Sequence, residues 1–291
     1  MPRRPRRQSL SSPLRRSDRG ERERAPEPMR IVLLVALALG GCERCEGPRR
    51  DVATLPDLGY PTCDGEALPE GEVIGENVLR SGPSMREQSV VERFEIRRRG
   101  CVTVVRSSQE WPLGTSDLDV VFDAELAPLR VWKRTTMPDA SGPIGHRDVR
   151  VFELRTDPVG VTRRTPTGAW ERFELRGPKP RAVIGPGRGL LTMWFRRARL
   201  AEGGRVREPV LDVREAMAQI RDVTLQRLQD RDVEGLGRVR VYTVFGREPI
   251  FTDEHDVVVG DLFGMRSASA VEGSIPDPLP DPGPIDPTAF E

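Results

Sequence analysis

The stretch Phe94-Glu-Ile-Arg-Arg-Arg-Gly-Cys-Val-Thr-Val104 decides the fold class, because apolar side chains recur at every second position on both sides of a glycine. Phe94 and Ile96 alternate with charged residues before the turn, and Val102 and Val104 flank Thr103 after it. Successive side chains of a β-strand point to opposite faces of a sheet, so this period of two indicates strands with one apolar face. Because Gly100 suits the turn, the stretch predicts a β-hairpin.

The same alternation recurs along residues 87–266. Leu118, Val120 and Phe122 alternate with aspartates, and an Ala-Pro turn then leads into a further strand pattern. More apolar residues in strand-like spacing follow at Leu129, Val131, Trp132, Val149, Val151, Phe173, Leu175, Val206, Val223, Leu225, Val239, Val241 and Phe245. We therefore predict one mainly β domain over residues 87–266, a curled antiparallel meander with one buried face. About 180 residues is a size that a single hydrophobic core supports.

One segment, Leu190 to Leu200, departs from this rhythm. Its apolar residues fall at i, i+3, i+4 and i+7, the spacing of an amphipathic helix, and they are Leu191, Trp194, Phe195 and Ala198. Gly203-Gly204 gives a stop signal after them. A twisted sheet that curls without closing leaves its inner face to be covered, and we expect this short helix to cover the concave face of a half-barrel. A second, weaker helical stretch is predicted near Arg214 to Ile220.

This order of elements resembles a periplasmic half-barrel family of unknown function and, more loosely, the lipoprotein-carrier half-barrels. The resemblance covers roughly residues 88–266. It rests on three stretches, which are Asp117-Leu-Asp-Val-Val-Phe-Asp123 with Ala127-Pro-Leu-Arg-Val-Trp132, the helix Leu191-Thr-Met-Trp-Phe-Arg196, and the closing hairpin from Arg238-Val-Arg-Val-Tyr242 to Val257-Val-Val-Gly-Asp261. The resemblance implies a half-barrel fold. It assigns no functional residue, because the family supplies no catalytic motif.

A short apolar run lies upstream of the domain, in Met29-Arg-Ile-Val-Leu-Leu-Val-Ala-Leu-Ala-Leu-Gly-Gly-Cys42. Residues 31–41 are about half of the roughly twenty that a membrane-spanning helix needs, which is typical of a signal-peptide core. A buried core helix is the alternative, but the run has no polar face and no helix cap. The stretch resembles a bacterial lipoprotein signal peptide over residues 29–41, which implies acylation of Cys42 after cleavage at the lipobox Leu39, Gly40 and Gly41.

The segments on either side of the domain differ from it in composition. Residues 1–28 hold nine Arg and four acids in a Pro- and Ser-rich background that cannot form a packed core. We expect translation to begin at Met29; a long signal-peptide n-region and a nucleic-acid arm are the alternatives. Residues 42–86 have the composition of a tether with a loop that leads into the domain, and residues 267–291 that of a disordered Pro- and Asp-rich tail.

The net charge argues against a nucleic-acid partner. The whole chain carries +1, but residues 1–28 and Arg30 are strongly basic, so residues 42 to 291 carry a net charge of −5. A general nucleic-acid or anionic-membrane surface needs a basic patch, which this balance disfavours. Nearly all cations are Arg, since Lys occurs only at Lys133 and Lys179.

Four cysteines are present, and the lipoprotein resemblance accounts for Cys42. In an oxidising envelope a pair of the remaining three is expected to form a disulfide. We favour Cys63 with Cys101, because this bridge would tie the irregular N-terminal segment to the first hairpin. Cys42 and Cys45 have Cys-x-x-Cys spacing, but no second pair or nearby His completes a metal or redox site.

No motif in the sequence predicts catalysis, a cofactor or a metal. The cluster Thr252-Asp-Glu-His-Asp256 offers metal-binding side chains, yet it lies between two strand patterns, and we interpret it as a polar hairpin turn. Gly185-Pro-Gly-Arg-Gly189 lacks the spacing of a phosphate-binding loop, and we interpret it as a turn into the helix. No Gly-x-Ser-x-Gly elbow occurs in the chain. An enzyme would need polar residues in a cleft near His146 or His255.

If the helix covers the concave sheet, its aromatic side chains would line any cavity that remains between them. Such an apolar pocket, formed by Leu191, Trp194 and Phe195, would accept a lipid or a partner's side chains. We therefore predict a non-enzymatic lipoprotein that binds an apolar ligand or an envelope partner. A structural or assembly role without a ligand is the alternative. Glu43 is not the Asp that commonly retains such proteins at the inner membrane, so an outer-membrane lipoprotein facing the periplasm is expected; the inner membrane and cell surface remain alternatives.

Overall fold

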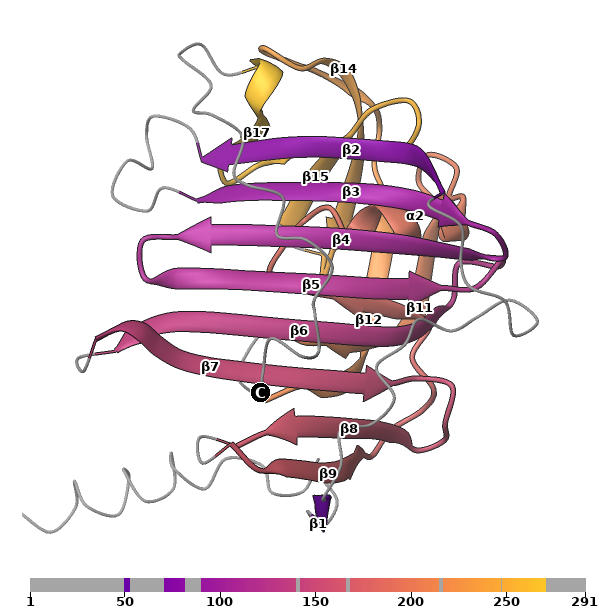
Figure 1. Ribbon diagram of the computed structural model, residues 1–291. Coiled ribbons are helices and arrows are strands. Elements are labelled where there is room, and N and C mark those ends of the chain that lie inside the picture. Colours follow the sequence, from indigo (N-terminus) through magenta and orange to yellow (C-terminus); the bar gives the residue numbers. More distant parts are fainter. Residues whose placement is uncertain are drawn as a thin grey trace, which may run out of the picture. The chain divides into compact units, whose positions relative to one another are not determined.

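A curled antiparallel sheet with a short helix against its inner face forms the domain (Figure 1). The computed structural model describes residues 50–52, 71–81, 90–139, 142–165, 168–214, 217–246 and 248–270. All of these belong to one structural unit, Arg44–Glu291. The fold class predicted from the period of two is therefore confirmed, as a mainly β half-barrel.

The first half of the sheet is a meander in chain order. It begins with the hairpin predicted from Phe94 to Val104, in which Arg99 pairs with Val102 and Gly100 takes a φ of 59°. The strands of this half are β2 (Glu72–Ser81), β3 (Val91–Arg99), β4 (Val102–Trp111), β5 (Gly114–Phe122), β6 (Pro128–Asp139), β7 (Gly142–Glu153), β8 (Val159–Arg164) and β9 (Trp170–Leu175). Each pairs antiparallel with the next.

The second half returns to the first through β17, which pairs antiparallel with β2. Its strands are β10 (Ala182–Ile184), β11 (Arg205–Asp212), β12 (Gln219–Arg227), β13 (Arg231–Val233), β14 (Gly237–Val244), β15 (Glu248–Thr252), β16 (Val258–Asp261) and β17 (Met265–Ser267). The pair β10 and β11 is parallel. Short β1 (Arg50–Val52) pairs with β9, and no pairing joins β1 to β10 across the described strands, so the sheet curls without closing.

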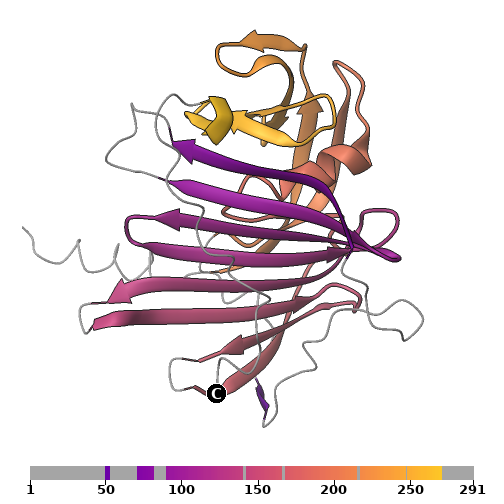
Figure 2. The ribbon, with the colours of Figure 1, turned by 45° about the horizontal axis from the view of Figure 1, so that its top comes forward.

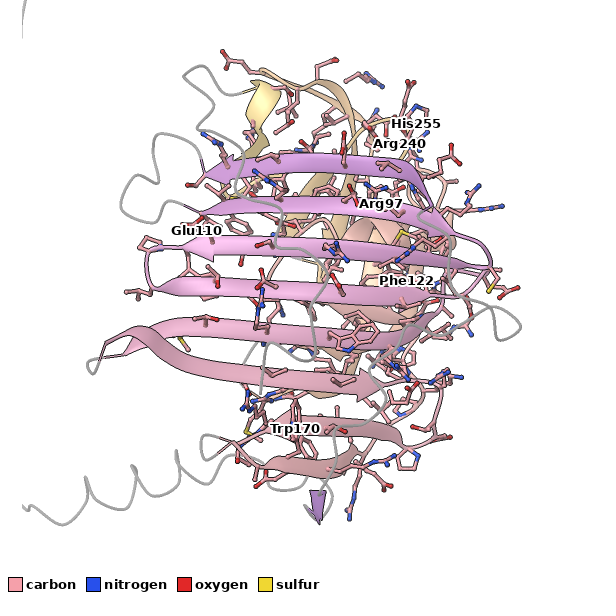
Figure 3. The ribbon with its side chains drawn as sticks, in the orientation of Figure 1. Arg97, Glu110, Phe122, Trp170, Arg240 and His255 are labelled. Atoms are coloured by element: carbon pink, nitrogen blue, oxygen red, sulfur yellow. The ribbon has the colours of Figure 1, made fainter. Side chains whose placement is uncertain are left out.

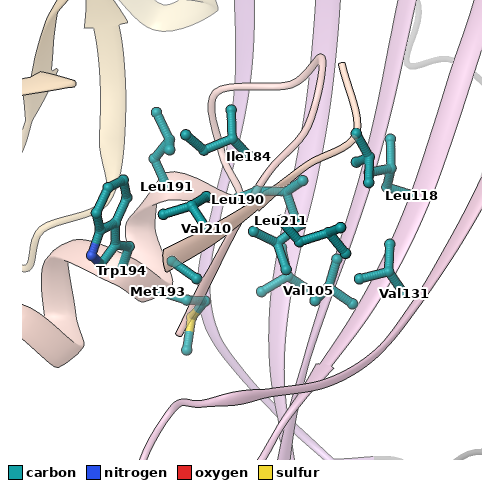
Figure 4. Close-up of a cluster of buried hydrophobic side chains, with 14 of the residues drawn as sticks. Val105, Leu118, Val131, Ile184, Leu190, Leu191, Met193, Trp194, Val210 and Leu211 are labelled. Atoms are coloured by element: carbon teal, nitrogen blue, oxygen red, sulfur yellow. The ribbon is translucent and has the colours of Figure 1, made fainter. Parts of the chain in front are cut away.

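The helix α2 (Leu191–Ala198) lies between the meander and the strands of the second half (Figure 2). Its residues Leu191 to Phe195 are buried, as the apolar spacing predicted. They share one core with side chains of both halves, among them Val105, Leu118, Val131, Val210 and Leu211 (Figure 4). Burying both sheet halves against one helix removes a large apolar area from water, which is the main term that stabilises this fold.

The helix ends earlier than predicted. Arg199 adopts a left-handed conformation with a φ of 45°, and its N–H donates to the carbonyl of Phe195, which closes the last turn. Gly203 and Gly204 therefore belong to the following turn and do not stop the helix. The second helix predicted near Arg214 to Ile220 is wrong, because Ile220 lies in β12 and pairs with Leu211. Pairing along the sheet overrides the weak helical pattern there.

The prediction of one buried face is incomplete. A second, smaller cluster of buried residues lies on the opposite face of the meander, formed by Val102, Val104, Val121, Trp132 and Val151. Leu118, Val120 and Phe122 belong to the main core, so Val121 points the other way from its two neighbours. Strands buried on both faces read as continuous apolar runs, which Val104-Val105 and Val120-Val121-Phe122 indeed form.

The close packing of the turn before α2 generates a stability prediction. A Cβ added at Gly189 would lie 2.1 Å from the Phe94 ring, so Gly189→Ala should lower the free energy of unfolding by about 1–3 kcal/mol. The control Gly160→Ala meets its nearest atom at 3.6 Å and should stay within about 0.5 kcal/mol of wild type. Urea denaturation measures both. Equal stabilities of the two variants would contradict this packing.

Candidate functional site

An open groove of about 710 Å³ lies at the end of the half-barrel where the C-terminal half of α2 meets several turns. Its walls come from the start of β2, the end of β3, the turn before β6, the helix α2 with its cap, and the turn between β15 and β16. The lining residues that matter below are Gly75, Glu76, Arg98, Arg196, Arg199, Asp253 and Asp256. His255 lies at the same end of the sheet as Arg240 (Figure 3). Elements far apart in the sequence thus form one opening.

Strained backbone is concentrated around this groove. Four non-glycine residues have a positive φ within the described ranges, and three of them line the groove: Leu126 at 61°, Arg199 at 45° and Asp256 at 61°. Such conformations cost free energy for residues with a Cβ and persist where the surrounding structure holds them, often at functional sites. This concentration identifies the groove as the candidate functional site.

The Arg196 guanidinium is fixed against one wall of the groove by two backbone carbonyls. Its Nε donates to the carbonyl of His255 at 3.0 Å, and its Nη2 donates to the carbonyl of Ile74 at 3.2 Å. Partial burial lowers the pKa of Arg196, and the positive charge of Arg98 lowers it further, while Asp253 and Asp256 oppose both effects. The nearby carboxylates therefore offset only part of the cost of removing the Arg196 charge from water.

Two of the three acidic side chains that line the groove, Asp253 and Asp256, have partners in the hairpin turn or on β14, whereas the Glu76 side chain makes no hydrogen bond or ion pair with another described residue. Asp253 Oδ1 accepts the N–H groups of His255 and Val257, at 2.9 and 2.8 Å. Asp256 Oδ1 accepts from Arg240 at 2.9 Å and from the Tyr242 hydroxyl at 2.8 Å. Burial and this carboxylate raise the pKa of Tyr242. The interpretation of Thr252 to Asp256 as a polar hairpin turn is confirmed.

The three residues predicted to line an apolar pocket are packed in the core. Leu191, Trp194 and Phe195 are buried, and the Phe195 ring stacks on Tyr242 with 4.3 Å between ring centroids. Trp194 Nε1 donates to Glu208 at 2.8 Å, and Arg197 also binds that carboxylate. None of the three lines the groove. Their polar and aromatic contacts hold α2 in place.

The glycine-rich loop before α2 binds a carboxylate of the protein itself. Glu92, which is fully buried, accepts the N–H groups of Arg188 at 2.6 Å and Gly189 at 2.7 Å. A Cβ at Gly187 would lie 2.6 Å from the same carboxylate. Burial raises the pKa of Glu92, whereas these hydrogen bonds lower it. The interpretation of this loop as a turn into the helix is confirmed, and Glu92 stands where an external anion would bind.

Several predicted residues cannot be placed. Leu39, Gly40, Gly41, Cys42 and Cys63 lie outside the described residues, as does the side chain of His146. Cys101, at the turn of the first hairpin, takes part in a disulfide, and its pairing with Cys63 stays a prediction.

Two features are absent from the described residues. No helix there is long and apolar enough to cross a membrane. No group of three or more His, Cys, Asp or Glu side chains is placed there to hold a metal ion.

Sequence reasoning missed the arginines of the groove and the buried Lys133. Lys133 Nζ donates to the carbonyl of Val213 at 2.6 Å, and burial together with the nearby Arg150 lowers its pKa to about 8. Lysine is rare in this Arg-rich chain, and this rarity is a weak sequence signal that Lys133 occupies an unusual position. For Arg196 and Arg199, the signal is that they fall outside the apolar set of the helix.

Comparisons with known proteins find distant structural neighbours and no family. No protein-family model matches the chain, and no curated protein matches it significantly. A structure of a DUF1089 family protein from Pseudomonas aeruginosa is 13% identical, with a TM-score of 0.37, over 58% of this chain and 87% of that one. A beta-barrel-like protein of the domain of unknown function DUF1849 from Brucella abortus is 10% identical, with a TM-score of 0.39, over 69% of this chain and 96% of that one. Both neighbours belong to families of unknown function, and the lipobox and carrier resemblances stay predictions.

The depressed pKa of Lys133 generates a pH prediction. Between about pH 8 and the unfolded value near 10.4, the unfolded state binds more protons, so this group makes the folded state more stable as pH rises. The stability of wild type minus that of Lys133→Met should therefore increase from pH 8 to pH 10, by at most about 1.4 kcal/mol per pH unit. Urea denaturation of both proteins at each pH measures the difference, in which other titrating groups cancel. A difference that stays flat across this range would contradict the burial of a charged Lys133.

Proposed function

We propose that the chain is a lipid-anchored protein of the bacterial cell envelope, whose half-barrel binds an envelope partner without catalysing a reaction. The stretch Leu39-Gly-Gly-Cys42 supports the anchor through its resemblance to a lipobox. The groove is the single observation that carries the binding role, because it gathers strained backbone and incompletely compensated cations at one opening. Two of its three carboxylates, those of Asp253 and Asp256, already accept hydrogen bonds within the protein, which favours binding over acid–base chemistry.

The proposed location is the outer membrane, with the domain facing the periplasm. Glu43 follows the acylated cysteine, and this is not the Asp that commonly retains lipoproteins at the inner membrane. The inner membrane and the cell surface are the alternative locations. Fractionation of the membranes by density distinguishes these cases.

A ligand-free structural or assembly role is the second candidate, and the filled interior favours it. An apolar ligand inside the half-barrel would require Leu191, Trp194 and Phe195 to leave a core in which each is buried. Opening such a site costs the packing and hydrogen bonds that these side chains make, so we place the binding surface at the groove.

The anchor is tested by metabolic labelling with an alkyne analogue of palmitate. Wild type and the control Cys45→Ala should both be labelled, since Cys45 lies beyond the lipobox. Cys42→Ala should lose the label and accumulate as the unprocessed precursor, because the diacylglyceryl group that carries the acyl chains is attached through the Cys42 sulfur. Label retained on Cys42→Ala would refute acylation at this residue.

The binding role is tested in cells with a photo-crosslinking amino acid placed at His255, which is exposed on the groove. The matched control carries it at Glu174, which is exposed on β9 and does not line the groove. A discrete adduct from position 255, absent from position 174, is the expected result. The same adducts at both positions, or none at position 255 in membrane-anchored protein, would leave the ligand-free structural role as the better account.

A further inference from the structure

Three arginines from two separate parts of the chain converge on the groove. Arg98 comes from the end of β3, whereas Arg196 and Arg199 come from the last turn and the cap of α2. Arg98 lies close enough to Arg196 to disfavour its charge. Partial removal of Arg196 from water is unfavourable, Asp253 and Asp256 offset part of this cost, and a bound anion would offset more of it.

Arg196 is oriented before any ligand arrives. Two of its nitrogens, Nε and Nη2, donate to the carbonyls of His255 and Ile74, and Nη1 has no hydrogen-bond partner among the residues that the structure describes. Gly75 lies beside this guanidinium, since a Cβ there would lie 3.4 Å from Nη2. A planar guanidinium that is already held in one orientation loses little conformational entropy when it binds an oxyanion.

Arg98 and Arg199 differ from most arginines of the domain. Neither makes an ion pair or side-chain hydrogen bond in the described part of the chain. By contrast, arginines elsewhere on the sheet bind carboxylates, namely Arg106, Arg130, Arg134, Arg150, Arg197, Arg214 and Arg221. Three carboxylates line the same groove: Asp253 and Asp256 are held by the hairpin turn and by Arg240, and Glu76 is exposed on β2.

We propose that the groove binds a phosphate oxyanion through Arg98, Arg196 and Arg199. Arginine forks match the geometry of phosphate oxygens and bind them with charge-assisted hydrogen bonds. The phosphate belongs either to a phospholipid headgroup of the membrane or to a free phosphate ester. This inference rests on the proposed function, because it names the chemical group that the partner presents to the groove.

The test uses the full acylated chain in micelles of a neutral detergent. Isothermal titration calorimetry measures binding of two probes, glycerol 3-phosphate and mixed micelles doped with phosphatidylglycerol, each against a phosphate-free counterpart. Binding of the doped micelles alone assigns the phosphate to a lipid headgroup, and binding of glycerol 3-phosphate assigns it to a free ester. Either result supports the proposal if the groove variants abolish it.

The variants separate the groove from general charge. Arg98→Gln with Arg199→Gln should weaken binding by about tenfold or more, because charge-assisted hydrogen bonds are lost. The control Arg205→Gln with Arg231→Gln makes the same change in net charge at two exposed positions outside the groove and should bind like wild type. Arg196→Lys keeps the charge without the fork and should bind about threefold to tenfold more weakly. Thermal unfolding checks that each variant folds.

Two results would overturn the inference. One is equal binding by the groove variant and its control, which would place the phosphate elsewhere. The other is the absence of binding by both probes. If the crosslink from position 255 persists in that case, the groove still binds a partner and only the phosphate chemistry is wrong. Loss of both the crosslink and the binding would remove the proposed binding role as well.

Discussion

The hydrogen bonds from the loop before α2 to the buried Glu92 carboxylate fix the helix inside the curled sheet. Arg188 and Gly189 donate from the loop, and Glu92 lies on β3, so the contact joins the two halves of the domain. With the loop held there, Leu191 to Phe195 enter the core and the last turn of α2 reaches the end of the sheet. The core and the groove therefore both depend on one buried polar contact, which would be costly to leave unpaired.

Hydrophobic period alone predicted most of the fold. The hairpin around Gly100, the later strands and the helix near Trp194 were identified because a sheet face repeats every two residues and a helix face about every 3.6. The weak pattern near Ile220 failed, since pairing of β12 with β11 supplies backbone hydrogen bonds that a short helix there cannot match. The helix boundary also differed, because Arg199 closes the last turn without a glycine.

The candidate site could not be predicted in the same way. Arg98 and Arg196 are almost a hundred positions apart, and only the curl of the sheet brings them to one opening. Left-handed backbone at Leu126 and Asp256 leaves no clear trace in the sequence, since neither is a glycine. An apolar helix face shows that side chains are buried, as Trp194 is, but does not show whether a cavity remains beside them. A helix that lines a pocket and a helix that packs in a filled core have the same apolar pattern in the sequence.

The high arginine content of this chain hides functional cations among structural ones. Composition and net charge do not distinguish Arg134, which is bound to Asp117, from Arg98, which has no carboxylate partner among the described residues. Their environments distinguish them. The charge of a paired arginine is balanced by its own carboxylate, whereas arginines that share an opening without such partners create an electrostatic potential that acts on other molecules. The half-barrel over residues 87–266 holds 31 Arg and Lys against 27 Asp and Glu, a net charge of only +4, so recognition of an anion depends on where its cations lie. Specific recognition of an anion by this protein therefore does not require a basic surface.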